Sequence, residues 1–543
     1  MDEAQFALTT PENEPVHDYA PGSPRRETIK KQLEKMASEQ IEIPVIIGGK
    51  EIYTGNTASV VMPHDHGHVL ATYHLAGPAE IEQAIQAAAA AWHEWPKLPW
   101  AERVSVFLRA AELLAGPYRD VVNGATMLGQ SKTVFQAEID SACETIDFFR
   151  YNSHFAHRIY AEQPESTLGQ WDRLDWRPLE GFILAISPFN FTSIAANLPT
   201  APAMMGNTAV WKPASTAVYS GYYLMKLFLE AGLPDGVINF IPSRGSVVGE
   251  LAVKHRDLGG IHFTGSTPTF CHLWREVGEN IDAYRSYPRL VGETGGKDFI
   301  VVHPSADVDA TVCAMVRGAF EYQGQKCSAA SRSYVPESLW KTIRKQLVET
   351  VEGIDQGDPR DFRNFTAAVI DEKAFDKIVG YIEYARESAD AEIIAGGTYD
   401  KSEGYFIRPT VVVTTDPHFR LMEEEIFGPV FTIFVYPDAQ YEEILTLCDG
   451  TSPYALTGAV FATDRHAIHK AHRALRYAAG NFYVNDKPTG AVVGLQPFGG
   501  SRASGTNDKA GSMLNLLRWT NPRTVKETFL PPREYRYPHM NEQ

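Results

Sequence analysis

The first 150 residues repeat hydrophobic positions at the spacing of helices. Residues 78–95 begin with a proline suited to a first helical turn and continue in strong helix formers. Residues 100–116 carry a second helical pattern, which ends at a glycine followed by a proline. A third pattern starts near Ala137 and places an apolar residue at every third or fourth position. These patterns predict a mostly helical N-terminal region.

From Gly181 onward, short apolar runs alternate with helical stretches. Buried strands are predicted at residues 181–186, 208–213, 237–242, 260–265 and 299–303. A second alternating series begins near Asp307, with strands predicted at residues 365–370, 408–413, 430–437, 455–462 and 481–485. Because strands that alternate with helices form parallel sheets, we predict an α/β protein with two Rossmann-like lobes.

The domain boundaries follow from these changes of pattern. Residues 1–44 are predicted to form an extended polar lead-in, residues 45–155 and 181–296 a nucleotide-binding domain, and residues 297–510 a second domain. Residues 156–180 and 511–543 lack a core of their own, although residues 523–530 have the composition of a strand. We expect them to form a small β element that bridges the subunits of an oligomer, with a simple surface hairpin as the alternative.

Composition and charge exclude several classes of protein. Of the 543 residues 44% are hydrophobic and 22% charged, and no apolar run approaches the ~20 residues of a membrane-spanning helix. The formal net charge of −17 argues against a nucleic-acid surface. The five cysteines are widely spaced without a CxxC pair, which indicates neither a disulfide framework nor a cysteine zinc site. Together with an acidic N-terminus that has no apolar segment, this pattern predicts a cytoplasmic protein.

One cysteine has unusual neighbours. Cys327 follows Lys326 in the segment YQGQKCSAASR, three residues after Gly324. A free cysteine is most often a small buried hydrophobic residue. A glycine that permits a tight turn and a lysine that would favour the thiolate of an exposed thiol point to a reactive cysteine instead. The residues alone leave both interpretations open.

Seven short motifs resemble those of the aldehyde dehydrogenases, in the order and at the spacing of that family, over roughly residues 45–530. They are SPFNF (187–191), WKPA (211–214), FTGS (263–266), GETGGK (292–297), GQKCS (324–328), EEIFGPV (424–430) and PFGG (497–500). No GxGxxG follows a predicted strand, but this family binds its cofactor without that fingerprint. The resemblance implies that the nucleotide-binding domain holds NAD and that the second domain is catalytic.

The resemblance also implies a role for each catalytic group. Cys327 would add to the aldehyde, because a tetrahedral thiohemiacetal releases hydride more readily than a planar aldehyde does. The side-chain amide of Asn190 and the backbone N–H of Cys327 would stabilise the oxyanion. Glu293 would be the general base that activates water to hydrolyse the thioester. A base at this position argues against transfer of the acyl group to coenzyme A.

For the NAD cofactor, the resemblance implies contacts from several motifs. Ser187 and Lys212 would lie near the adenosine ribose, Gly249, Gly265 and Ser266 near the pyrophosphate, and Glu425 and Phe427 at the nicotinamide ribose and ring. Ser215 departs from the family, since many NAD-selective members have a glutamate there that grips the ribose 2′-hydroxyl. A serine does not repel a 2′-phosphate, so we expect a preference for NAD and leave some use of NADP open.

Four long segments are similar to the members that oxidise L-glutamate γ-semialdehyde to L-glutamate, the second step of proline degradation. They are residues 187–203, 286–303, 321–332 and 485–511. This resemblance implies that the substrate's carboxylate is bound by Ser328 and by the backbone N–H groups of Gly490 and Ala491. Phe498 would pack against the substrate's methylene groups, unless it is ordinary core.

The resemblance makes a homodimer or larger homo-oligomer the expected assembly, with transient contact to a separate proline dehydrogenase as a further possibility. It places His64, His66 and His68 in a surface hairpin, so we expect no metal site, although their alternation would suit metal ligands on a strand.

Alternative functions are oxidation of another carboxylated semialdehyde such as succinic semialdehyde, a cysteine hydrolase or thioesterase, and an inactive binding protein. A hydrolase would need a histidine near the thiol, and the Cys327 motif contains none.

Overall fold

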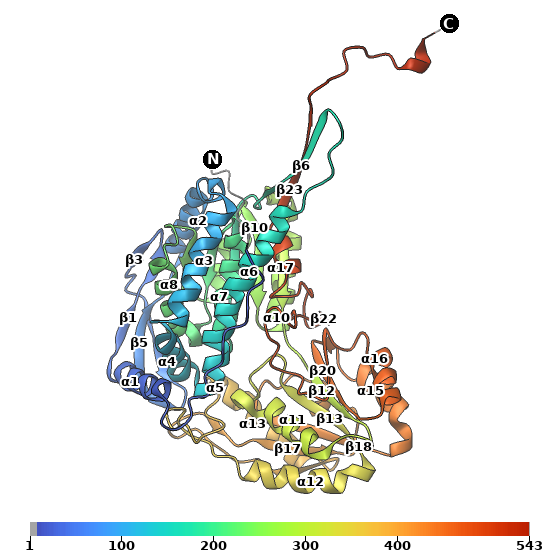
Figure 1. The fold of residues 1–543 in the computed structure, drawn as a ribbon. Helices are drawn as coiled ribbons and strands as arrows, with labels where there is room; N and C mark the ends of the chain where they lie inside the picture. The colour runs from blue at the N-terminus through green and yellow to red at the C-terminus, as the bar shows by residue number, and fades with distance from the viewer. Residues whose placement is uncertain (1–7, 542–543) are drawn as a thin grey trace.

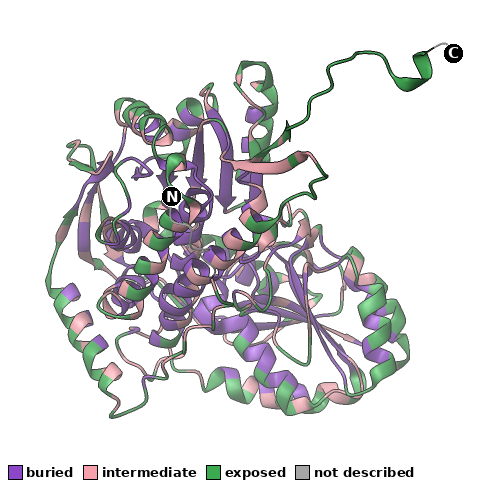
Figure 2. Ribbon diagram, turned by 45° about the horizontal axis from the view of Figure 1, so that its top comes forward, coloured by how far each residue is buried: buried purple, intermediate pink, exposed green. Residues whose placement is uncertain are grey.

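The computed structural model describes residues 8–541 and shows two α/β lobes with an arm that projects from them (Figure 1). Within those residues, no helix is both long and apolar enough to cross a membrane. The buried residues line the two central sheets, whereas the outer faces of the surrounding helices are exposed (Figure 2). The α/β fold class predicted from the alternating pattern is confirmed.

The first lobe is built on a seven-stranded sheet in the order β11-β10-β7-β8-β9-β2-β3. Strands β7 to β11 are parallel, and β2 and β3 add an antiparallel edge. The strands are β2 (Val45–Ile47), β3 (Lys50–Ile52), β7 (Phe182–Ile186), β8 (Thr208–Lys212), β9 (Ile238–Phe240), β10 (Leu258–Thr264) and β11 (Arg289–Glu293). Apolar residues fill both faces of this sheet, as expected for parallel strands covered by helices on each side.

Helices cover this sheet as the sequence pattern predicts. They are α2 (Pro78–Trp92), α3 (Trp100–Ala115), α4 (Arg119–Gln130), α6 (Thr145–Ala161), α7 (Thr192–Met204), α8 (Val218–Glu230) and α10 (Thr267–Glu279). The helix predicted from Ala137 begins as α5 (Val134–Ala137) and continues through a π-helical stretch, Glu138–Glu144, into α6. Because π-helical turns recur at functional sites, this stretch is a candidate part of the active site.

The second lobe holds a seven-stranded sheet in the order β14-β17-β18-β13-β12-β20-β21. Its strands are β12 (Asp298–Val302), β13 (Ala330–Pro336), β14 (Ala391–Ala395), β17 (Thr410–Thr414), β18 (Val430–Tyr436), β20 (Thr457–Phe461) and β21 (Asn481–Val484). Helices α11 (Val308–Phe320), α12 (Glu337–Glu352), α13 (Glu372–Glu387), α15 (Tyr441–Gly450) and α16 (Arg465–Ala474) surround it. The run at 299–303, which the sequence pattern grouped with the first series of strands, lies in this second sheet as part of β12.

The strand predicted at residues 365–370 is wrong. This segment is a buried loop that forms one isolated bridge, between Thr366 and Gln356, and otherwise binds scattered backbone groups and side chains. Gln323 Nε2 donates to the carbonyl of Ala368 at 2.6 Å, and the N–H of Ile370 donates to Gln325 Oε1 at 2.9 Å. Apolar composition alone could not reveal that two distant glutamines satisfy this backbone.

The N-terminal lead-in is not extended throughout. Residues 24–38 form helix α1 (Pro24–Ser38), capped by the Ser23 side chain, and its apolar face is buried. A small sheet of β1 (Ile41–Ile43), β5 (Asp65–His74) and β4 (Thr57–Met62) follows. The first seven residues of the lead-in lie outside the described part of the chain.

The projecting arm consists of β6 (Gln170–Arg177) paired with β23 (Asn521–Thr528) in antiparallel register. The C-terminal residues continue beyond it, away from both lobes (Figure 1). Its residues are exposed or half-exposed, so the described chain supplies little cover for either face. Both segments that we assigned to a bridging element thus come together in one two-stranded ribbon.

Candidate active site

Cys327 lies in a loop that its surroundings hold rigidly. Tyr322, Gln323 and Gly324 have φ values of 51°, 54° and 64°, so three consecutive residues are left-handed. A side chain at Gly324 would meet the carbonyl oxygen of Gly428 at 2.3 Å, so the turn requires glycine. The Gln323 and Gln325 side chains tie the same loop to residues 368–370. The two left-handed residues with side chains persist because these contacts fix them.

Cys327 lines two different cavities. One, of about 510 Å³, is bordered by residues 188–190, 264–266, 294–295 and 425–427, and we call it the cofactor-side cavity. The other, of about 310 Å³, is bordered by residues of segments 13–16, 135–147, 191–194 and 487–498, and we call it the aldehyde-side cavity. The sulfur atom therefore lies where the two cavities adjoin, which is where a group held in one could react with a group held in the other.

Glu293 lies at the end of β11, with its Oε1 4.0 Å from Cys327 Sγ. Burial raises the pKa of Glu293 to about 8, opposed by the positive charge of Lys509. Burial, reinforced by the Glu293 carboxyl, also raises the pKa of the Cys327 thiol well above its usual value. This direction is opposite to the thiolate that we expected Lys326 to favour, because Cys327 is only 7% exposed and Lys326 Nζ is paired with Glu321 at 3.1 Å. The thiol therefore needs a base, and the nearby Glu293 carboxylate can accept its proton.

Asn190 lies just before α7 on the cofactor-side cavity. Its Nδ2 donates to the carbonyl of Gln325, two residues before Cys327, at 3.1 Å. The amide group has two N–H bonds, so one contact leaves a second donor for an oxygen atom next to the sulfur. Asp140 fixes this segment, because its carboxylate accepts from the backbone N–H groups of Thr192 and Ser193 at 3.0 Å each.

The polar groups of the cofactor-side cavity fit a dinucleotide. Gly265 and Ser266 follow β10 and lead into the N-terminus of α10, whose first turn offers backbone N–H groups to an anion. The carboxylate of Glu425 accepts from the N–H of Gly296 at 3.0 Å, and the Phe427 ring packs edge-on against Phe189 at 5.8 Å. This position, at the carboxyl ends of parallel strands, is where open α/β sheets bind nucleotides.

The other residues expected at the cofactor lie outside the lining of this cavity. Ser187 and Lys212 are buried at the ends of β7 and β8, where Ser187 Oγ accepts from Trp211 Nε1 at 2.9 Å. Burial lowers the pKa of Lys212 to about 8, and its Nζ donates to the carbonyl of Pro213 at 3.1 Å. Ser215 is exposed beyond β8, and Gly249 lies at the end of α9 (Gly245–Val248) with open space beside its Cα.

All four residues expected to bind the aldehyde line the aldehyde-side cavity: Ser328, Gly490, Ala491 and Phe498. The Ser328 hydroxyl is hydrogen-bonded to that of Thr489 at 2.8 Å. Sequence analysis did not select Thr489, although it directly precedes Gly490. Phe498 also borders a small neighbouring cavity, which Glu293 lines as well.

Several charged residues of this cavity were missed. They are Glu14, Glu144, Asp147, Glu321 and Lys487. Burial raises the pKa of Glu144 to about 8 and that of Asp147 to about 6. Only Glu144 and Asp147 carried a sequence signal, as charged residues on an otherwise apolar helical face. Acidic and basic groups together make the cavity suited to a ligand that carries both charges.

The three alternating histidines make unrelated contacts. His64 Nδ1 is hydrogen-bonded to Ser131 Oγ at 3.0 Å, and His66 Nε2 to the carbonyl of Lys401 at 3.0 Å. His64 and His66 lie at the turn and start of the β4–β5 hairpin. Within residues 8–541, no group of three potential ligands could hold a metal ion.

Comparison with known proteins places these features in a family. The profile of the aldehyde dehydrogenase family matches residues 52–525. A protein of Dictyostelium discoideum named Delta-1-pyrroline-5-carboxylate dehydrogenase, mitochondrial, is 53% identical over 99% of this chain and 97% of its own length. The protein of the same name from Bos taurus is 50% identical over 97% of this chain and 94% of its own length.

Solved structures agree with the sequence relatives. The crystal structure of Delta-pyrroline-5-carboxylate dehydrogenase from Mycobacterium tuberculosis, bound with NAD, superposes with a TM-score of 0.97 at 53% identity and covers 100% of both chains. The similarity therefore extends over both lobes and the arm.

Proposed function

This chain belongs to the aldehyde dehydrogenase family, and we propose that it oxidises L-glutamate γ-semialdehyde, the open form of Δ1-pyrroline-5-carboxylate, to L-glutamate with NAD. The reaction is the second step of proline degradation. The observation that carries the proposal is the position of Cys327, which borders both the cofactor-side and the aldehyde-side cavity.

In the first step, Cys327 adds to the aldehyde carbon as Glu293 accepts the thiol proton. The resulting thiohemiacetal oxyanion lies near the Asn190 amide, with the backbone N–H of Cys327 as the second donor. NAD held in the cofactor-side cavity would supply the carbon that accepts the hydride. The oxyanion then collapses to a carbonyl, so a thioester remains on Cys327.

In the second step, water hydrolyses the thioester. Glu293, once it has released the thiol proton to solvent, removes a proton from the water that attacks the acyl carbon. Because burial raises the pKa of Glu293 to about 8, the carboxyl can exchange protons near neutral pH. L-glutamate leaves, and the Cys327 thiol is restored.

The remaining residues would contact either NAD or the aldehyde, and four of those assigned to NAD lie beyond the lining of the cofactor-side cavity. On the cofactor side, Gly249, Gly265 and Ser266 would contact the pyrophosphate of NAD, and Glu425 and Phe427 the nicotinamide ribose and ring. Ser187, Lys212 and Ser215 would contact the adenosine ribose. On the aldehyde side, the substrate's carboxylate would be held by Ser328 and by the N–H groups of Gly490 and Ala491, with Phe498 against the methylene groups. Residues 45–155 and 181–296 would form the NAD-binding domain and residues 297–510 the catalytic domain.

The arm supports a homo-oligomer as the working assembly. A two-stranded ribbon with little cover on either face is marginal by itself, and pairing with a second subunit would stabilise it. Residues 156–180 and 511–543 would be the bridging segments. Transient contact with a separate proline dehydrogenase is part of the same proposal, because such an enzyme must supply the semialdehyde.

The predicted cytoplasmic location is wrong. The relatives from Dictyostelium discoideum and Bos taurus are named as mitochondrial proteins, which points to the mitochondrion. Cysteine spacing separates oxidising from reducing compartments, but it does not separate one reducing compartment from another.

A panel of aldehydes tests this function directly. Purified protein with NAD should reduce the cofactor fastest, in terms of kcat/KM, with L-glutamate γ-semialdehyde, compared with succinic semialdehyde and butanal. Equal or higher values for succinic semialdehyde would favour oxidation of that compound. The same panel with NADP measures the consequence of Ser215, and acyl-ester hydrolysis without cofactor would indicate a hydrolase.

A further inference from the structure

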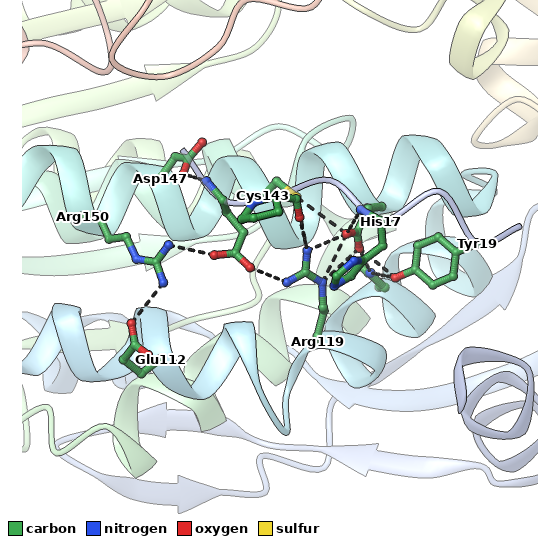
Figure 3. Close-up of polar contacts among 11 residues, drawn as sticks. His17, Tyr19, Glu112, Arg119, Cys143, Asp147 and Arg150 are labelled. Carbon is green, nitrogen blue, oxygen red and sulfur yellow. Dashed lines mark hydrogen bonds and ion pairs between the residues drawn. The ribbon is translucent and has the colours of Figure 1, made fainter. Parts of the chain in front are cut away.

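The chain segment before α1 crosses the wall of the aldehyde-side cavity. We call residues 13–17 the N-terminal strap. Asn13, Glu14 and Val16 line the cavity, although they are more than 300 residues from Cys327 in the sequence. Figure 3 shows the strap passing over the helices that carry Arg119, Asp147 and Arg150. This position raises the question of whether the strap merely packs there or shapes the site.

A buried ionic cluster holds the strap in place. The Glu14 carboxylate accepts from Arg119 Nη1 at 2.6 Å and from Arg150 Nη1 at 2.7 Å (Figure 3). Arg119 also binds the buried Glu138 carboxylate, which in turn accepts from the N–H of His17 at 2.9 Å. Both ends of the strap are therefore fixed by charge-assisted hydrogen bonds, which are the stronger kind.

Asn13 connects the strap to residues 487–498, the loop that we expect to bind the substrate's carboxylate and that we call the carboxylate loop. Its Nδ2 donates to Asp147 Oδ2 at 2.7 Å and to the carbonyl of Val493 at 2.8 Å. Its Oδ1 accepts from the Tyr151 hydroxyl at 3.2 Å. Val493 lies two residues after Ala491, so this contact fixes the backbone of the carboxylate loop close to its N–H groups.

Helix α6 supports the same loop from another side. Val493 packs with Phe148 and Tyr151 in a small buried cluster. Gly494 has φ +82° and lies so close to Tyr151 that an added Cβ would meet the ring at 2.2 Å. The loop is thus held between α6 and the strap, and Asn13 is a side chain of the strap that binds both.

We propose that the N-terminal strap completes the aldehyde-side cavity and that Asn13 is a positioning residue for the carboxylate loop, acting through the Val493 carbonyl. Asn13 would set the orientation of the Gly490 and Ala491 N–H groups without touching the aldehyde group. This inference rests on the proposed function for the identity of the substrate. It predicts an effect on substrates with a carboxylate and little effect on substrates without one.

The test compares Asn13→Ala and Asn13→Asp with wild type. Loss of the two donated hydrogen bonds, one of them to a carboxylate, should raise KM for L-glutamate γ-semialdehyde about tenfold in Asn13→Ala. Asn13→Asp should raise it further, because the new carboxylate would face Asp147 and a carbonyl. In both variants kcat, and KM for butanal, should remain close to the wild-type values.

The matched control is Glu12→Gln, which changes an exposed neighbour that does not line the cavity. Tyr151→Phe removes only the hydroxyl that Asn13 accepts from, so it provides a milder variant if changes at residue 13 prevent folding. It should raise the same KM by a smaller factor. Unchanged KM values in well-folded variants, or equal changes for both aldehydes, would overturn the inference.

A binding measurement separates this inference from the proposed function. Calorimetry should show weaker binding of L-glutamate, the product, to Asn13→Ala than to wild type by a similar factor. If wild type binds L-glutamate but does not oxidise the semialdehyde, the proposed function fails while the role of the strap can still be judged. If binding of L-glutamate is equal in both proteins, the role assigned to Asn13 is wrong.

Discussion

The two cavities that adjoin at Cys327 are built in different ways. The cofactor-side cavity combines segments that follow β7, β10 and β11, at one edge of a parallel sheet, with residues 370–378 and 425–427 of the second lobe. The aldehyde-side cavity is assembled from the strap, the π-helical stretch before α6, the start of α7 and the loop at 487–498. Topology places the first lobe's part of the cofactor-side cavity, because parallel strands bring their carboxyl ends together. The aldehyde-side cavity depends on contacts between remote segments, so it is the part in which relatives with this fold can differ in substrate.

The strongest test of this comparison removes the atom that both cavities share. Cys327→Ala should abolish turnover, since no thiohemiacetal can form, while NAD still binds to the intact cofactor-side cavity. Stopped turnover in the aldehyde panel and an unchanged dissociation constant for NAD by calorimetry would support the shared role. Cys271→Ala, at an exposed cysteine, is the control and should be fully active. Appreciable turnover in Cys327→Ala would refute the mechanism.

A change at Glu293 should separate the two chemical steps. Glu293→Gln should still reduce NAD once in each site, more slowly because the Cys327 thiol has lost its base, but should fail to activate water for hydrolysis of the thioester. Rapid mixing should therefore show a burst of about one NADH per active site followed by very slow turnover. If steady turnover continued without a burst, the base would have to be another residue.

Asn190 lines the cofactor-side cavity, whereas its proposed role is to stabilise the oxyanion formed from the aldehyde. Asn190→Ala should slow formation of the adduct by roughly 100- to 1000-fold, as expected for loss of one oxyanion donor. The amplitude and rate of the NADH burst measure this step. Binding of NAD should change little, and a decrease of only a few-fold in the burst rate would show that the contact with Gln325 is purely structural.

Ser328 tests the aldehyde side alone. Ser328→Ala should lower kcat/KM for L-glutamate γ-semialdehyde by a factor that corresponds to about 1–3 kcal/mol of transition-state free energy, because the carboxylate would lose a hydrogen bond. Butanal, which has no carboxylate, should lose much less. The Thr489 hydroxyl, which is hydrogen-bonded to Ser328 in the wild type, is still present in Ser328→Ala. Thr489→Val removes that hydroxyl and keeps Ser328, so it is the matched variant. Equal losses for both aldehydes would show that Ser328 supports the Cys327 loop instead.

The smallest expected effect is a pH dependence of the hydrolytic step. The raised pKa of Glu293, about 8, means that the carboxyl is mostly protonated at neutral pH and becomes an effective base as the pH rises. The slow phase after the NADH burst should therefore accelerate by roughly tenfold between about pH 7 and 9. The same profile in Glu293→Gln should be flat in this range. A wild-type rate that is independent of pH would assign the limiting step elsewhere.

Much of the fold could be predicted from the sequence, because periodic apolar positions determine which faces are buried. The exceptions have physical causes. Residues 365–370 look like a strand, but the Gln323 and Gln325 side chains and scattered backbone groups bind their backbone in place of a continuous strand partner. Helix α1 carried a signal that was overlooked, since Ser23 precedes Pro24 and the apolar residues that follow have helical spacing.

For the site, the motifs identified Cys327, Glu293 and Asn190 as candidates and also the residues of the carboxylate loop. They did not identify the strap or the buried charges around it. Glu14 and Arg119 are both charged and lie 105 positions apart in the sequence. Nothing in the sequence around either residue shows that their side chains pair. Burial of such groups is decided by their partners rather than by their own hydrophobicity.

The contact between Asn13 and Val493 also has a consequence for how the cavity is made in the cell. The two residues are separated by 480 positions, so the strap leaves the ribosome long before the loop that it must bind exists. At usual rates of translation this interval is roughly 24 to 96 s. During that time the first residues of the chain can contact α4 and α6 but not the carboxylate loop. The aldehyde-side cavity is therefore completed only late in synthesis, when the carboxylate loop reaches the N-terminal strap.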